Sequence, residues 1–292
     1  MSPRVTHLTD PAATPSSRRL AWLATGEDGT PLGTAFLRVF TKEGQTHLAE
    51  LDVRVHPAER RRGVGTALLD AAIVSAREDR RRAVIAQADQ GSPGDAFLAA
   101  RGFRRVLTLM YARLELSGID PDHITRILEQ PCPGYHLTRW TGVVPPELAR
   151  TYAASRRAMD DMPMGDTDYG RVVWDVERVV AAAEAIARRG DTLYTVAAVH
   201  TSSGTIVGFS ELVLPGDGKG EGQHYGTAVL PEHRGHGLGL RMKAEAIRHA
   251  HALAPDLALL TDTAEENLPM RQVNEALGYR PTHTAIEYQL DL

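Results

Sequence analysis

The chain has a single cysteine, Cys132, among its 292 residues. One cysteine excludes an intrachain disulfide and any metal site built from several thiolates. Aromatic residues make up only 5% of the sequence, and no apolar run approaches the length that a membrane-spanning helix needs. The first residues also lack the apolar core of a signal peptide. We therefore expect no metal site, no membrane association and a cytoplasmic protein.

Excess charge of either sign is also small. The formal net charge is −4, and the arginine runs at residues 60–62 and 80–82 are flanked by acidic residues. Nucleic-acid-binding domains usually carry a clear excess of positive charge, so this balance argues against a nucleic-acid partner. The length suits about two domains that each bury their own core.

What the sequence does contain is one loop pattern twice. Residues 55–65 and 229–239 each leave a strand-like segment through a proline and enter an Arg-x-x-Gly-x-Gly turn that opens an amphipathic helix. Glycines let backbone N–H groups face a ligand, and the start of the helix adds partial positive charge. The pattern predicts a pyrophosphate-binding loop in each half of the chain.

The predicted elements around the two loops repeat as well. In the second half, a strand at 135–140 and two helices at 146–159 and 172–188 come first, and the first half has no counterpart to these helices. We expect domains at residues 1–120 and 134–292, joined by a linker at 121–133. The order that repeats is the following, with the residue ranges of the first half before each semicolon and those of the second half after it: three strands (19–25, 32–40, 47–55; 192–200, 205–214, 223–230), a helix (64–78; 238–251), a strand (83–88; 256–263), a short helix (95–101; 268–277) and a strand (106–116; 283–290).

This order, with each short helix ending in Gly102-Phe103 or Gly278-Tyr279, resembles the GNAT acyltransferase superfamily in two tandem copies. The resemblance covers nearly the whole chain. It implies an α/β (α+β) protein with two GNAT folds, each a mixed, mostly antiparallel twisted sheet flanked by helices. The tandem arrangement is similar to that of actinobacterial mycothiol synthase and related tandem acetyltransferases.

The resemblance implies acetyl-CoA as co-substrate and direct transfer of an acetyl group to an amine. At matching positions, the backbone of residues 229–230 would hold the pantetheine arm, residues 234–239 would hold the pyrophosphate, and Asn267 would meet the pantetheine. The cofactor-binding residues so implied are Val55, Arg60, Gly63, Gly65, Val229, Leu230, Arg234, Gly235, His236, Gly237, Leu238, Gly239, Asn267 and Asn274.

The second copy is the one we expect to be catalytic. Family members build the acceptor pocket largely from the helix pair before the three strands, and only the second copy has that pair. The first copy also has Gly91 where the second has Asn267. One residue argues the other way, because Glu50 in Ala49-Glu50-Leu51 is similar to the family's general base. Its alternative is a solvent-facing carboxylate.

Acyl transfer to an amine needs a base, an oxyanion stabiliser and a proton donor for the thiolate. Glu211 and His224 are the candidate bases, and His224 matches Glu50 by counting back from the loop glycine; Tyr225 is a weaker candidate or a pocket wall. A surface histidine and an exposed strand carboxylate are the alternatives. Many family members have a tyrosine where this chain has Asn274, which donates hydrogen bonds but no proton.

Residues 159–169 hold four aspartates and three methionines between the two added helices. The corresponding loop in the family overhangs the acceptor, so we expect a small, cationic amine as acceptor; an ordinary solvated acidic loop is the alternative. We also keep a second function open, a non-catalytic tandem module that binds CoA as a sensor or scaffold. The two copies would pack as a monomeric pseudo-dimer, or the chain would form a homodimer.

Overall fold

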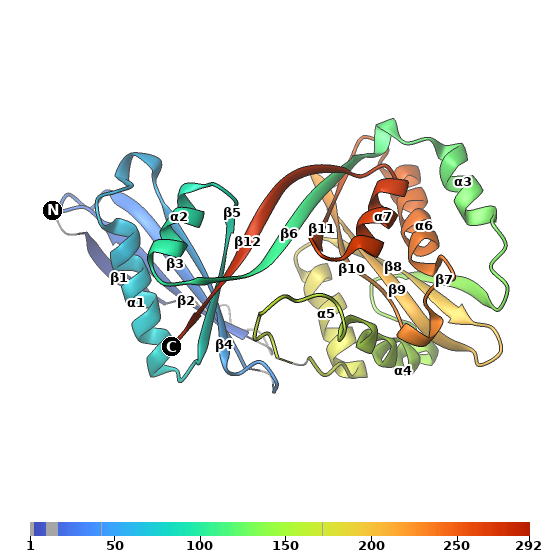
Figure 1. Ribbon diagram of the computed structural model, residues 1–292, viewed down its shortest axis with the longest axis horizontal. Helices are drawn as coiled ribbons and strands as arrows, with labels where there is room; N and C mark the ends of the chain where they lie inside the picture. Colours follow the sequence, from blue (N-terminus) through green and yellow to red (C-terminus); the bar gives the residue numbers. More distant parts are fainter. Residues whose placement is uncertain (1–2, 10–16, 42, 171) are drawn as a thin grey trace. The chain divides into compact units, whose positions relative to one another are not determined.

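The computed structural model describes residues 3–9, 17–41, 43–170 and 172–292. It divides the chain into two compact units (Figure 1). In each unit the paired strands are mostly antiparallel and helices accompany them, as the predicted α/β fold class requires. Neither unit is one consecutive segment. Unit 1 comprises Met1–Thr108, Met164–Val173 and Thr284–Leu292, and unit 2 comprises Leu109–Pro163 and Trp174–His283.

In unit 1, the strands neighbour one another in the order β1-β2-β3-β4-β5-β12. The β4–β5 pair is parallel, and the β1–β2, β2–β3, β3–β4 and β5–β12 pairs are antiparallel. β1 was not predicted, because its short segment lacks an apolar alternation. The elements are β1 (Arg4–Leu8), β2 (Ser17–Thr25), β3 (Pro31–Phe40), β4 (Leu48–Val55), α1 (Val64–Glu78), β5 (Ala83–Asp89), α2 (Pro93–Ala100) and the end of β12 (Arg280–Asp291).

In unit 2, the strand order is β6-β11-β10-β9-β8-β7, with β10 and β11 parallel and the other neighbouring pairs antiparallel. The predicted helix at 146–159 breaks after Ser155 into a 3₁₀ turn, Arg156–Met159. The elements are β6 (Arg104–Glu115), α3 (Pro121–Glu129), β7 (Tyr135–Thr141), α4 (Pro146–Ser155), α5 (Val176–Arg188), β8 (Thr192–His200), β9 (Thr205–Leu214), β10 (Glu221–Val229), α6 (Leu238–Leu253), β11 (Ala258–Ala264) and α7 (Leu268–Ala276).

The parallel strand pair of each unit diverges before its glycine loop. In unit 2 the bridges end at Gln223 and Leu260, although β10 runs on to Val229. In unit 1 they end at Leu51 and Ala86. The diverging edges have backbone N–H and C=O groups that no longer bond across the pair, so a ligand between the strands can use them.

Residues 164–173, which we call the crossing segment, follow α4 in the chain but pack in unit 1. The Asp168 amide donates to the Gln289 side chain, and the Tyr169 hydroxyl donates to Glu287, both over 2.9 Å. Gly170 has φ 68°, and a Cβ there would lie 2.0 Å from the Gly44 carbonyl oxygen. Close approach of two backbones therefore requires glycine at 170. These contacts assign residues 164–169 of the predicted acceptor loop to unit 1, whereas residues 159–163 belong to unit 2.

Candidate functional site

The glycine loop of unit 2 leaves backbone amides exposed at the start of α6. Gly235 and Gly237 have φ of 83° and 69°, and a Cβ at either would meet no atom within 4 Å. Their need for glycine is therefore conformational. Gly237 provides no side-chain cap to α6, and in the described ranges no backbone carbonyl accepts from the amides of 235–237. These N–H groups can bind an anion.

A cleft of about 430 Å³ runs along this loop and the diverging part of β10. The structure thus brings together most of the cofactor-binding residues predicted for this half. Leu230 is buried outside the cleft lining, and the ring of His236 lies 5.0 Å from that of Tyr135. The lining comprises Ala158, Asp161, Met162, Pro163, Thr227, Ala228, Val229, His233, Arg234, Gly235, Gly237, Leu238, Gly239, Leu240, Asn267, Pro269, Met270 and Val273.

Arg234 already has an acidic partner in this cleft. Both terminal nitrogens donate to the carboxylate of Asp161 over 2.7 Å, and its Nε donates to the Val229 carbonyl over 2.9 Å. The hydrogen bonds from Arg234 lower the pKa of Asp161, which keeps its carboxyl group ionised. An anionic ligand must compete with this carboxylate for the guanidinium.

Two asparagines predicted to bind the cofactor, Asn267 just before α7 and Asn274 within it, form hydrogen bonds inside the chain. Asn267 caps the helix, because its Oδ1 accepts from the Met270 amide over 3.2 Å. In unit 1 the same capping position belongs to Ser92, so helix geometry matches Asn267 with Ser92 and not with Gly91.

Asn274 lies in a buried polar network. Its Oδ1 accepts from Lys243 Nζ over 2.7 Å, and its Nδ2 donates to Thr263 Oγ1 over 3.1 Å. Burial lowers the pKa of Lys243 to about 7. Sequence reasoning missed this lysine, because its neighbours on α6 have the pattern of an ordinary amphipathic helix.

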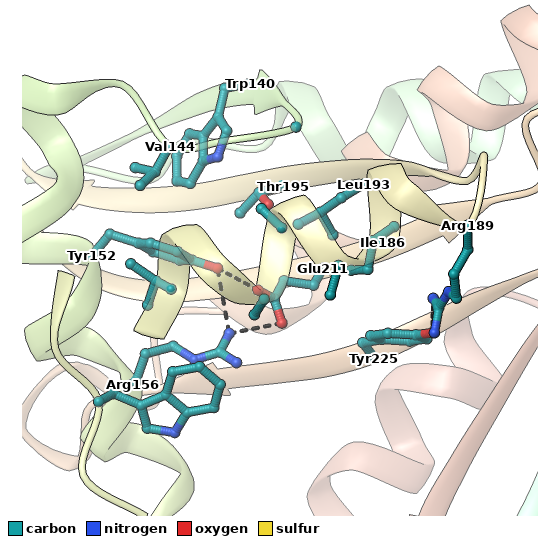
Figure 2. A pocket seen from close by; sticks show the side chains of 16 residues that line it. Trp140, Val144, Tyr152, Arg156, Ile186, Arg189, Leu193, Thr195, Glu211 and Tyr225 are labelled. Carbon is teal, nitrogen blue, oxygen red and sulfur yellow. Dashed lines mark hydrogen bonds and ion pairs between the residues drawn. The ribbon is translucent and has the colours of Figure 1, made fainter. Parts of the chain in front are cut away.

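A second cavity, of about 260 Å³, is lined by α4, α5 and the strands beneath them. In Figure 2, Tyr152, Arg156 and Glu211 point toward one another. The Tyr152 hydroxyl donates to the Glu211 carboxylate, and Arg156 Nη1 lies 2.7 Å from Glu211 Oε2. The Arg156 guanidinium lies 4.1 Å from the Trp174 ring centroid and 4.5 Å from that of Phe209. The Glu211 carboxylate is therefore held by two groups.

These contacts shift the pKa values of Tyr152 and Arg156. Burial raises the pKa of Tyr152 well above its ordinary value, and the neighbouring Glu211 charge adds to the effect. Burial by itself would lower the pKa of Arg156, but Glu211 and Tyr152 raise it overall. Glu211 can take a proton from a substrate only by giving up favourable interactions with both partners.

His224 and Glu211 lie on opposite faces of the sheet. His224 faces Leu212 across the strands, whereas Glu211 faces Gly226, and side chains alternate along a strand. Burial lowers the pKa of His224 well below its usual value, so the ring is neutral at pH 7. The two candidate bases therefore do not face the same cavity.

Tyr225, which lies between the bridged residues His224 and Gly226, forms a β-bulge and lines the second cavity. Its hydroxyl accepts from Arg189 Nη2 over 2.8 Å. The bulge adds one residue to β10. Counting back from the loop glycine therefore matches Glu50 with His224, whereas the strand register matches Glu50 with Gln223. Glu50 is bridged to Arg38 and Ile85 on its neighbouring strands. Gln223 is bridged to Val213 and Leu260 at the corresponding positions.

Unit 1 has its own glycine loop, with Gly63 at φ 85°, and Arg60 Nε donates to the Val55 carbonyl over 3.4 Å. A Cβ on Gly65 would lie 3.5 Å from both Phe97 and Val55, which is ordinary contact.

Glu50 lies 3.3 Å from Arg38 and lines a cavity of about 300 Å³. Tyr169 of the crossing segment contributes to its lining. Glu50 is therefore not simply a solvent-facing strand carboxylate, because it borders a cavity that strand residues and one residue of the crossing segment enclose.

Within the described ranges, no three His, Cys, Asp or Glu side chains are grouped to hold a metal ion. No helix in the same ranges has the length and apolarity to cross a membrane.

Comparison with known proteins gives a family match over most of the chain. The model of the acetyltransferase (GNAT) family matches residues 4–103 and 158–279. A mycothiol acetyltransferase of Geodermatophilus obscurus is 43% identical over 108 residues, which are 37% of this chain and only 33% of that protein's length.

Two solved structures share the fold over nearly the whole chain. A tandem GNAT protein from the clavulanic acid biosynthesis pathway has a TM-score of 0.77 and 25% identity, covering 96% of this chain and 84% of its own. A GCN5-related N-acetyltransferase from Sphaerobacter thermophilus has a TM-score of 0.64 and 17% identity, and the alignment covers 93% of this chain and 80% of that chain.

Proposed function

The chain belongs to the acetyltransferase (GNAT) family, and on that premise we propose that unit 2 transfers an acetyl group from acetyl-CoA to the amine of a small molecule. The observation that carries the proposal is the divergence of β10 from β11 toward the glycine loop, with the cleft of about 430 Å³ along it.

The residues of this cleft fit acetyl-CoA. The amides at the start of α6, which have no backbone acceptor among the described residues, suit the diphosphate. The edge of β10 at Thr227–Val229, where β10 and β11 are no longer bridged, offers backbone groups to the pantetheine amides. Met270 and Val273 supply apolar contact. Once bound, acetyl-CoA supplies the activated acetyl thioester. The chain has to align the amine, remove its proton and exclude competing water.

The second cavity is the place proposed for the acceptor. Its walls are largely apolar and aromatic, with Trp140 and Trp174 among them, and its volume of about 260 Å³ suits a small molecule rather than a protein segment. In this proposal, Glu211 and Tyr225 orient the amine, and Asn274 and His224 support the strands from the other face. The acidic residues of 159–169 do not line this cavity.

The test begins with binding. Calorimetry with acetyl-CoA should give a Kd that rises at least about tenfold in Gly237→Val, because a side chain at φ 69° distorts the loop. Gly63→Val is the matched change in unit 1, and it shows whether the first loop contributes. Turnover is then followed as thiol release with a panel of small amines.

The alternative, a CoA sensor, has one observation in its favour: Glu211 and Arg234 are both engaged by partners within the chain. Acetyl-CoA binding without thiol release for any amine in the panel would overturn the transferase proposal and support the sensor.

A further inference from the structure

The diverging strand pairs of the two units carry the same two chemical groups in reversed order. In unit 1, the carboxylate is Glu50 on β4 and the amide is Gln87 on β5. In unit 2, the amide is Gln223 on β10 and the carboxylate is Asp262 on β11.

The strand registers establish that these positions correspond. Glu50 bridges Ile85, and Gln87 lies two residues further along β5. Gln223 bridges Leu260, and Asp262 lies two residues further along β11. Residues two apart on a strand share a face, so each carboxylate and its amide lie on the same face of their sheet.

In unit 2 this face is the one that carries the proposed acceptor cavity. The residues on either side of Asp262 face the opposite way, since Thr261 accepts from Lys243 over 3.3 Å and Thr263 accepts from Asn274. Gln223 faces Val213, two residues from Glu211 on the same strand face. Asp262 therefore shares its face with Glu211.

Asp262 also lies at the point where β10 and β11 diverge. Gln223 and Leu260 form the last bridged pair, so Asp262 is the first residue of β11 beyond it on this face. The strands separate at this point, and Asp262 is the carboxylate that β11 carries there.

The surroundings of Asp262 suit a group that exchanges protons. The residue is exposed to solvent, but the atoms packed around it are dense enough for desolvation to raise the pKa of its carboxyl group. The positive charge of Lys243 on α6 and a hydrogen bond from Gln223 on β10 limit that rise. Across the sheet, Tyr111 of β6 is its register partner. Glu211, in contrast, is held by Arg156 and Tyr152.

We propose that Asp262 is the base that accepts the proton of the acceptor ammonium, and that Gln223 is its positioning residue. This inference rests on the proposed function. The Asp262 carboxylate takes one proton from the ammonium, leaving a neutral amine. The amine nitrogen then forms the new N–C bond as the C–S bond of the thioester breaks. The second nitrogen proton goes, through water, to the departing thiolate, which yields free CoA. Asp262 returns its proton to solvent.

The first experiment is Asp262→Asn, which keeps the shape and removes the charge. The value of kcat/KM for an accepted amine should fall at least about 100-fold, within the usual contribution of a general base. The Kd for acetyl-CoA, measured by calorimetry, should stay within about twofold of the unchanged protein, which separates lost chemistry from lost folding. Asp256→Asn, in the turn before β11, is the control and should leave both values unchanged.

The second experiment moves the carboxylate. The double variant Gln223→Glu/Asp262→Asn reproduces the order found in unit 1, and it should recover at least about tenfold of the activity lost in Asp262→Asn. A readout without acetyl-CoA is carboxyl-carbon NMR of the aspartate-labelled protein. One resonance should titrate above the ordinary aspartate value of 3.8 and vanish in Asp262→Asn.

Asp262→Asn with at least about a third of normal kcat/KM would overturn the assignment while leaving the transferase proposal intact. Loss of activity in Glu50→Gln, with Asp262→Asn still active, would overturn it too and move the chemistry to unit 1. Binding of acetyl-CoA with no amine accepted by the unchanged protein would overturn the proposed function and this inference together.

Discussion

The carboxylate of Asp161 is bound by both terminal nitrogens of Arg234, each over 2.7 Å, inside the cleft of unit 2. The same guanidinium is anchored to the end of β10 through Val229. An internal carboxylate thus stands beside the glycine loop, where the proposed ligand brings its own negative charges.

Removing this competitor should strengthen ligand binding. Asp161→Asn is expected to lower the Kd for acetyl-CoA about twofold to fivefold, because an exposed pair of this kind contributes about 0.2–1 kcal/mol. Calorimetry at low and high salt measures this change in Kd. Asp160→Asn, the neighbouring change, should have no such effect. A weaker affinity in Asp161→Asn would mean that the pair supports the loop instead of competing for it.

Breaking the buried ion pair between Arg156 and Glu211, in the wall of the second cavity, should lower the stability of the protein. Arg156→Met leaves the Glu211 carboxylate buried without its positive partner, so the free energy of unfolding should fall by about 3–5 kcal/mol. Urea denaturation measures the change. Adding Glu211→Gln should restore much of it, because the uncompensated charge is then gone. Arg126→Met, at an exposed pair with Asp120, is the control and should change it by less than about 1 kcal/mol.

The pH dependence of stability should show the buried lysine. The pKa of Lys243 falls from 10.5 unfolded to about 7 folded, so between these values the unfolded chain binds more protons. Stability therefore rises with pH across this window, by up to about 1.4 kcal/mol per pH unit, and the full penalty is present below pH 7. Urea titrations at pH 7 and pH 9 should show a rise that Lys243→Met lacks. Equal slopes in the two proteins would contradict the lowered pKa of Lys243.

The crossing segment should depend on Gly170. Gly170→Ala adds a Cβ 2.0 Å from a backbone oxygen as well as the cost of a left-handed backbone, about 1–2 kcal/mol. Gly134→Ala is the matched control, with φ 84° and no atom near the added Cβ, so it has the backbone cost alone. Limited proteolysis should cut near residues 164–173 faster in Gly170→Ala than in Gly134→Ala. Similar rates would show that the contact with Gly44 is easily released.

Local sequence patterns predicted much of this architecture. The helix at 64–78 and the strands at 192–200 and 205–214 have the bounds that periodicity gave, because each has a continuous apolar face ended by glycine or polar residues. Both loops have left-handed glycines at the expected places, Gly63 and Gly237.

The site was less accessible to sequence reasoning, for a physical reason. The bulge at Tyr225 cannot be recognised from a single sequence. Because it adds one residue to β10, counting from the loop glycine misses the correspondence between Gln223 and Glu50. The partners of Glu211 lie on another element, and only tertiary packing brings Tyr152 and Arg156 to it. Pairing between distant segments determines which carboxylates are free.

The make-up of unit 1 has a consequence for its synthesis. Its strand partner for β5 is Thr284–Leu292, which the ribosome adds after every residue of unit 2. The part of the protein that is translated first is therefore completed last, and until then the edge of β5 is exposed to aberrant pairing with other nascent chains.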